Sequence, residues 1–160
     1  GYYQTPAAQA AESRSQTGPQ SKIQKLKAKI GGLAVDNFAL VRPEHLNHHG
    51  SLFGGQLLKW VDEFAWMAAS REFRGCKLVT IAMDRVEFRR SAPSGAILRF
   101  HVEPARLGNT SVTYSVEVFA DAPGADHEVP IFSTHITFVH VDSNGVKLPL
   151  PRKSGFSKKA

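Results

Sequence analysis

The sequence predicts an α+β fold in which one long central helix is wrapped by an antiparallel sheet of about five strands. Three features predict it: an early apolar stripe at helical spacing, later runs that alternate apolar and polar residues, and turn residues between those runs. Strands joined in a meander form an antiparallel sheet, whose apolar face a helix can cover. With 42% hydrophobic residues and no visible internal repeat, the 160-residue chain suffices for one domain.

The first predicted elements are a short strand and the long helix. A strand near Phe38–Val41 leads into the loop Arg42–Gly50, and the helix runs from about Gly54 to Phe73. The helix is predicted because apolar residues recur at spacings of three and four: Leu57, Leu58, Val61, Ala65 and Ala68.

Four longer strands are predicted after the helix. In the first, Leu78–Phe88, the alternation changes parity between Met83 and Val86, which indicates a β-bulge near Asp84-Arg85. The others contain Leu98–Glu103, Val112–Val118 and Phe132–Val139, and the last one closes at the turn Asp142–Gly145.

The positive charge is concentrated at the two ends of the chain. Residues 1–30 carry five Lys/Arg and one acid, residues 151–160 carry four Lys/Arg, and residues 31–150 carry 11 basic and 13 acidic residues. We therefore predict a disordered basic extension at 1–30, a folded domain at 31–151 and a basic tail at 152–160. The capping-box pattern Ser21–Gln24 opens a possible short basic helix within the extension, which would dock on the domain or a membrane surface, or stay solvated and partly helical.

Composition also bounds the compartment and the partners. The single cysteine, Cys76, cannot form an internal disulfide, and no apolar run approaches the ~20 residues needed to cross a bilayer. We therefore expect a cytoplasmic protein without a transmembrane segment. Because the central part of the chain is slightly acidic, we expect no nucleic-acid partner.

The stretch from Asn47 to Asp62 is the most informative part of the sequence. A polar, histidine-bearing loop passes through Gly54-Gly55 into the helix, where Asp62 interrupts the apolar residues. Glycines let backbone approach a ligand closely, and free amides at a helix start can stabilise a developing oxyanion. Gly55 and Asp62 are seven residues apart, close to two turns, and so share a face. These are the parts of a hydrolytic site.

Each of these residues has a plainer alternative. Asp62 could be an exposed residue bonded to Lys59, but its apolar neighbours would make an idle carboxylate costly. Glu63, rotated by about 100°, is expected to face solvent or an interface salt bridge. Asn47 could only stabilise a turn, and Gly54-Gly55 could only allow close packing.

A metal site is a further alternative for this loop. His45, His48 and His49 fall within five residues, but no second cluster of carboxylates or cysteines has matching spacing. We therefore expect the histidines to serve loop structure or polarity, and we expect no metal.

Several segments then form a recognisable set in a fixed order: Asn47–Gly55 running into Trp60–Glu63, then Arg85–Phe88, Leu107–Ser111, and Thr137–Asp142 before Asn144-Gly145. Through them the chain from about Asn37 to Pro151 resembles the hotdog-fold acyl-coenzyme A (CoA) thioesterases, in particular the cytosolic acyl-CoA hydrolase branch. The resemblance implies a dimer formed by joining two sheets edge to edge, often assembled into trimers of dimers, with sites built from both protomers.

The resemblance also implies roles for residues. Asp62 matches the catalytic carboxylate, Asn47 matches the asparagine that completes the site, and Gly54 and Gly55 lie where the oxyanion donors are expected. The implied reaction, within fatty acid metabolism, converts acyl-CoA and water to a free acid and CoA without a metal or organic cofactor. Asp62 would either activate water or attack the thioester directly.

The phosphates of CoA would need cationic and hydroxyl partners. Candidates are Arg89 and Arg90 after the long strand, with Arg106 and Ser111 around the Gly108 turn. The alternative is that paired arginines at a strand end are solvated or protect a sheet edge.

Other functions remain open at this point. A hotdog dehydratase acting on 3-hydroxyacyl thioesters would recruit His48 or His49 as its base, and a sensor would bind acyl-CoA or a nucleotide without turnover. The Asn-His-His-Gly and Phe-Gly-Gly pattern favours the hydrolase.

Overall fold

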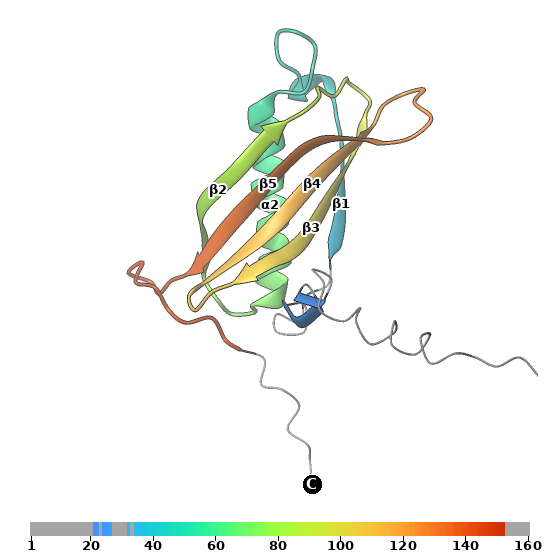
Figure 1. Cartoon of the computed structure of the whole chain (residues 1–160). Coiled ribbons are helices and arrows are strands. Elements are labelled where there is room, and N and C mark those ends of the chain that lie inside the picture. The colour runs from blue at the N-terminus through green and yellow to red at the C-terminus, as the bar shows by residue number, and fades with distance from the viewer. Residues whose placement is uncertain (1–20, 23, 27–31, 33, 153–160) are drawn as a thin grey trace, which may run out of the picture.

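A five-stranded antiparallel sheet curves around one 19-residue helix, α2 (Gly54–Glu72), in the computed structural model (Figure 1). The structure describes residues 21–22, 24–26, 32 and 34–152. The strands are β1 (Val35–Leu40), β2 (Leu78–Phe88), β3 (Ile97–Leu107), β4 (Ser111–Asp121) and β5 (Val129–His140), and a short 3-10 helix, η1 (Pro43–His45), follows β1. The predicted fold class is therefore confirmed.

The strand order places β1 and β2 at opposite edges of the sheet. The order is β1-β3-β4-β5-β2, with every neighbouring pair antiparallel. Strands β3, β4 and β5 form a meander, but β2, predicted as its first strand, pairs with β5 instead of β3 and lies at the edge away from β1, because the connection after β2 crosses the sheet. Each flank of α2 therefore lies near a different edge strand.

The core lies between α2 and the inner face of the sheet. The buried helix residues Leu57, Val61, Ala65 and Ala69 are spaced by four, so they form one stripe. They share a core with Phe100, Val116, Phe132 and Phe138, all fully buried, from the sheet. Leu58 and Ala68, predicted in the same stripe, are only half-buried because they flank it.

The predicted bulge in β2 is confirmed. The register with β5 shifts between Asp84 and Glu87, and Arg85 adopts a positive φ of 51°, a conformation that non-glycine residues seldom adopt. Thr134 stabilises the bulge because its buried hydroxyl donates to the Asp84 carbonyl at 2.8 Å. A second shift, between Thr80 and Ala82, was not indicated by the alternation.

The element boundaries differ little from those expected. Strand β1 begins at Val35, three residues before the predicted start, and ends at Leu40, one residue before the predicted end. Ser21, Lys22 and residues 24–26 are helical, but the rest of the predicted basic helix and most of both tails lie outside the described residues. Within the described parts of the chain, no helix is both long and apolar enough to span a bilayer.

Candidate active site

The loop before α2 is a tight turn organised by Asn47. The Oδ1 atom of Asn47 accepts from the backbone N–H groups of His49 at 2.9 Å and Ser51 at 3.2 Å. The Asn47 N–H donates to the Ser51 carbonyl at 2.7 Å, and Gly50 supplies the positive φ of 78° that the turn requires. The side-chain oxygen is therefore committed to the turn, which leaves the amide nitrogen to face a ligand.

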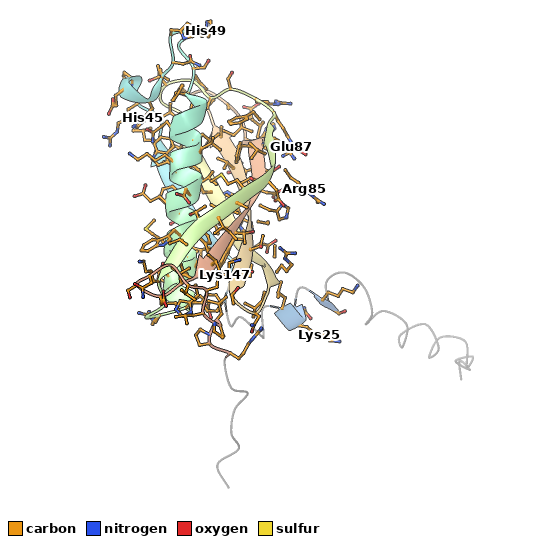
Figure 2. The ribbon with its side chains drawn as sticks, turned by 90° about the vertical axis from the view of Figure 1, so that its left-hand side faces the viewer. Lys25, His45, His49, Arg85, Glu87 and Lys147 are labelled. Carbon is orange, nitrogen blue, oxygen red and sulfur yellow. The ribbon has the colours of Figure 1, made fainter. Side chains whose placement is uncertain are left out.

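The histidines of this segment have different surroundings. His45 is half-buried: its Nδ1 accepts from the Arg42 N–H at 3.0 Å, and its ring packs edge-on against Trp60 with centroids 4.7 Å apart. The rings of His48 and His49 lie 3.8 Å apart and are exposed on the projecting loop, where Figure 2 labels His49. Among the described residues, no three His, Cys, Asp or Glu side chains form a group able to hold a metal ion.

The helix start presents two backbone amides without a partner in the described chain. The N-cap, Phe53, makes no side-chain cap, and the first bonds within the helix are donated by Gln56 and Leu57 to its carbonyl. The amides of Gly54 and Gly55 thus remain free at the positive end of the helix dipole. A Cβ atom at Gly55 would lie 2.5 Å from the Phe53 ring, so glycine lets that ring cover the helix start.

Asp62 lies on the flank of α2 that faces the edge strand β2. Its side chain is half-buried, and its Oδ1 accepts from the Thr80 hydroxyl at 2.6 Å. A hydrogen bond to a carboxylate is among the stronger ones in proteins, so Thr80 holds Asp62 in one orientation. The neighbouring Glu63 is exposed, in line with one of the two surroundings expected for it.

Thr80 was missed by the sequence reasoning. The residue lies in an otherwise apolar run, Leu78–Met83, and a polar residue there is the only signal that the sequence offers. Nothing in the sequence pairs it with a helix residue 18 positions earlier, because that contact depends on how β2 crosses α2.

One protomer does not bring the helix start and Asp62 to the same point. Gly55 and Asp62 share a face of α2, but the rise along the helix to Asp62 is about 10 Å from Gly55 and about 12 Å from Gly54. A single thioester carbonyl cannot contact both the Gly54 amide and Asp62 across that distance. Asn47 is bonded within its own loop, and no hydrogen bond joins it to Asp62 in the described part of the chain.

The four candidate CoA contacts are divided between the two ends of the sheet. Arg89 lies just after β2, whereas Ser111 begins β4. Phe88 aligns through Phe132 with Val118, seven residues beyond Ser111, so the two sites are roughly 23 Å apart along the strands. Arg106 and Ser111 do lie together, because they flank the turn closed by the bond from the Gly108 N–H to the Ser111 carbonyl.

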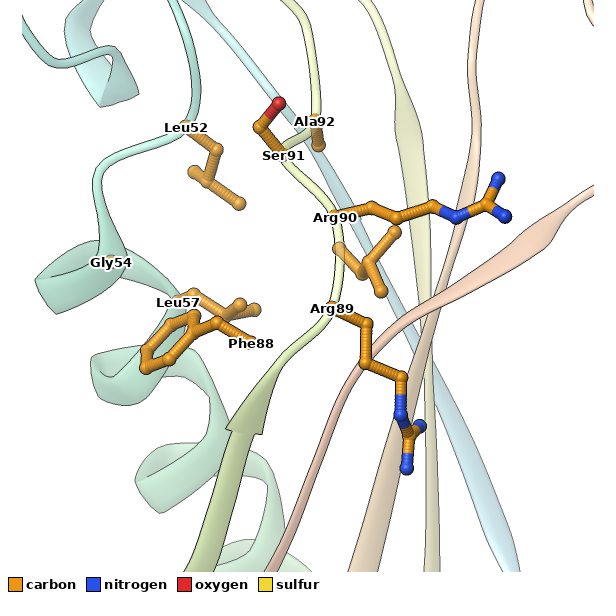
Figure 3. Close-up of a pocket in the computed structure, with 9 residues that line it drawn as sticks. Leu52, Gly54, Leu57, Phe88, Arg89, Arg90, Ser91 and Ala92 are labelled. Atoms are coloured by element: carbon orange, nitrogen blue, oxygen red, sulfur yellow. The ribbon is translucent and has the colours of Figure 1, made fainter.

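Arg89 and Arg90 border a hollow of about 300 Å³ beside the start of α2 (Figure 3). Arg89 donates to Glu87 at 2.9 Å and to Ser133 at 3.0 Å, so it is already held on the sheet. Figure 3 shows both guanidinium groups pointing away from Leu52 and Leu57 on the other wall. Their charges therefore face the outside of the hollow.

A helix with free N-terminal amides and a carboxylate on one flank, wrapped by a five-stranded antiparallel sheet, has the architecture of the hotdog fold. A family model described as "Thioesterase superfamily" matches residues 49–126. The chain belongs to the hotdog-fold acyl-CoA thioesterase family.

Curated relatives agree with this assignment. A mouse protein named acyl-coenzyme A thioesterase 11 is 34% identical over 110 residues, which cover 68% of this chain and 18% of the relative. The Bacillus subtilis protein YkhA, named an uncharacterized acyl-CoA thioester hydrolase, is 30% identical over 70% of this chain and 64% of its own length. The chain therefore spans less than two thirds of either relative.

Solved structures share the fold. An apo-hexameric acyl-CoA thioesterase is 27% identical with a TM-score of 0.70, covering 81% of this chain and 83% of that one. A Staphylococcus aureus acyl-CoA hydrolase, solved with butyryl-CoA, CoA and CoA disulfide, is 27% identical with a TM-score of 0.66, covering 74% and 72%. Variants of that hydrolase with an aspartate, an asparagine or a threonine changed to alanine have also been solved.

Proposed function

We propose that this protein is an acyl-CoA thioesterase that converts acyl-CoA and water to a free acid and CoA. One observation carries the proposal: α2 holds both the Asp62 carboxylate, which accepts a hydrogen bond from Thr80 of β2, and the free amides of Gly54 and Gly55. A thioester carbonyl is already electrophilic, so its hydrolysis needs mainly an activated nucleophile and a stabilised oxyanion.

Asp62 supplies the negatively charged group in this mechanism. It either takes a proton from the attacking water, or attacks the carbonyl itself and displaces the CoA thiolate to form a mixed anhydride that water then hydrolyses. In both routes the Thr80 hydroxyl fixes the rotamer of Asp62 and leaves its second oxygen for the reaction. Asn47 orients the water or the thioester through its amide nitrogen, because its oxygen is occupied by the turn.

The complete site combines two protomers. Because about 12 Å separates the helix start from Asp62 within one chain, the oxyanion donors of one protomer act with the Asp62 of another. The exposed apolar side chains along β2 support an edge-to-edge dimer, and the hexameric relative supports a trimer of dimers. The same assembly would unite Arg89 and Arg90 of one protomer with Arg106 and Ser111 of another around CoA.

The set of residue types also supports hydrolysis. An aspartate, an asparagine and a threonine were each replaced in the S. aureus hydrolase, and Asp62, Asn47 and Thr80 are residues of these types around the candidate site. No step in this mechanism calls for a metal or an organic cofactor. With Cys76 as the only cysteine, a reducing compartment such as the cytoplasm suits the chain.

The test is thiol release from short, medium and long acyl-CoAs, measured in a Cys76→Ser background so that the protein contributes no thiol. Asp62→Asn keeps the shape of the side chain and removes its charge, so we expect the rate to fall about 10²- to 10⁴-fold. Glu63→Gln, the matched change one residue away, should leave the rate within about twofold. Enoyl-thioester formation without thiol release would instead identify the dehydratase, and tight CoA binding without either product would identify the sensor.

A further inference from the structure

A second cavity lies on the flank of α2 opposite Asp62. It encloses about 600 Å³, within the range of small-molecule sites, and is bordered by β1, β4 and the C-terminal half of α2. Arg71, which lines it, is nine residues from Asp62, or two and a half helical turns, so the two side chains leave the helix in opposite directions. Asp62 instead contacts β2, at the other edge of the sheet (Figure 1).

One end of this cavity is apolar. Phe64, Met67 and Ala68 form its helix wall, and Val35 on β1 contributes from the sheet side. From Phe64 to Glu72 the helix rises about 12 Å. This wall suits a linear hydrocarbon chain lying along the helix.

The other end is polar and contains a buried hydroxyl without a partner. Tyr114 lines the cavity and is 2% exposed, and its hydroxyl has no hydrogen-bond partner among the described residues. Burial, with a smaller contribution from the Glu72 carboxylate, raises the pKa of Tyr114, so the phenol keeps its proton and remains a donor. A buried donor without an acceptor is costly, so this group is suited to a ligand oxygen.

Charge at this end favours an anion. Arg71 and Arg74 line it and are exposed, and Glu72 is the carboxylate beside them. The other carboxylate of the lining, Asp36, is bonded to His101 at 2.7 Å and to Arg99 at 3.4 Å. Arg71 and Arg74 therefore offer two exposed guanidinium groups near the Tyr114 hydroxyl, and guanidinium groups bind carboxylates.

We propose that this cavity binds a medium-chain carboxylic acid, with its carboxylate between Tyr114, Arg71 and Arg74 and its chain along Phe64 and Met67. The proposed hydrolysis releases acids of this class. The binding proposal rests on that function only for where the acid comes from. A product site on the flank opposite Asp62 would let the free acid bind while the catalytic flank turns over substrate.

The experiment is isothermal titration calorimetry of the full chain with decanoate. We expect saturable binding of one decanoate per chain. Met67→Trp fills the apolar end and should abolish it, whereas Tyr114→Phe, which removes only the hydroxyl, should weaken it about 3- to 10-fold. Lys59→Gln, an exposed change on the same helix, is the control. Absence of saturable binding, or binding unaffected by Met67→Trp, would overturn the proposal.

Two further arms separate related outcomes. Decanol has the same chain without the charge, so it should bind at least about tenfold more weakly than decanoate; equal binding would refute the carboxylate assignment.

Thiol release by Met67→Trp should equal that of the wild type. If it falls together with decanoate binding, the cavity belongs to the catalytic acyl channel, and the separate site is refuted. Because calorimetry does not depend on turnover, an inactive enzyme that binds decanoate would contradict only the proposed hydrolysis.

Discussion

Strands β2 and β4 are both 11 residues long and belong to one sheet, yet their surroundings differ. In β4 the inward residues Val112, Tyr114, Val116 and Val118 are all buried. In β2 only Leu78 is buried, while Ile81, Val86 and Phe88 are 53%, 41% and 54% exposed. One chain therefore covers its central strand and leaves the apolar residues of its edge strand in solvent, where a second chain can cover them.

The same difference separates the two flanks of α2. On the β2 flank, the Asp62–Thr80 pair lies beside an open edge and belongs to the site that we propose two chains complete. On the β1 flank, the cavity beside Tyr114 is bounded by elements of one chain. Catalysis on the first flank should therefore depend on assembly, and binding on the second should not.

Placing a charge on the open edge should have the largest effect. Ile81→Lys adds a cation to an exposed position of β2, where the monomer tolerates it but a dimer would have to bury it. We expect dissociation to monomers in analytical ultracentrifugation, with thiol release reduced at least about 100-fold. Val146 is an exposed residue in the turn that follows β5, so Val146→Lys is the control and should stay assembled. An active Ile81→Lys monomer would refute the two-protomer site.

Matched valines test the covered and uncovered strands directly. Val116→Ala in β4 removes two buried methyl groups and should lower the free energy of unfolding by about 2 kcal/mol. Val86→Ala in β2 should change that of the monomer by no more than about 0.5 kcal/mol. Denaturant unfolding in the monomeric Ile81→Lys background measures both, and equal losses would show that β2 is already covered.

Removing the hydroxyl that holds Asp62 should have a smaller effect on catalysis. Thr80→Val keeps the shape and deletes the donor, so we expect kcat to fall about tenfold with KM nearly unchanged. Thr80→Ser retains the hydroxyl and should recover most of the rate. If serine and valine are equally slow, the β-methyl packing of Thr80 matters rather than its hydrogen bond.

The smallest expected effect concerns an ion pair on the sheet. Hydrogen bonding and charge from Arg99 hold the pKa of Glu128 below its ordinary value of 4.5. A depressed carboxyl pKa adds stability above that ordinary value and loses it as the pH falls through the folded-state value. Glu128→Gln should therefore cost less than about 1 kcal/mol at neutral pH, and the difference should vanish in acid. Unfolding at both pH values, with Glu117→Gln as control, measures this, and a cost that persists in acid would rule out the ion pair as its source.

Local patterns were sufficient to predict most of the fold. The spacing of Leu57, Val61 and Ala65 predicted α2, and alternation predicted the strands, because burial on one face imposes a period that the sequence records. Even the bulge at Arg85 was visible as a change of parity. The register shift between Thr80 and Ala82 was not visible in the sequence. Most residues around it are exposed, so they show no alternation between buried and exposed positions.

The candidate site was only partly accessible from sequence. Gly55 and Asp62 could be assigned to one helix face from their spacing, but the rise of about 10 Å between them became informative only with the rest of the fold. The Asn47 oxygen is hydrogen-bonded within its own turn, and the Thr80 hydroxyl is hydrogen-bonded to Asp62. Both contacts depend on the folded geometry, which residue type alone does not predict.

The sequence by itself determined the elements, their order and the residue types available for chemistry, since these follow from the periodicity of burial and from intrinsic chemistry. Only the tertiary structure decided which strand lies at an open edge, which flank of α2 each side chain faces, and that the Tyr114 hydroxyl meets a cavity. The reason is physical: contacts between segments far apart in the chain depend on packing of the whole domain, which no local pattern encodes.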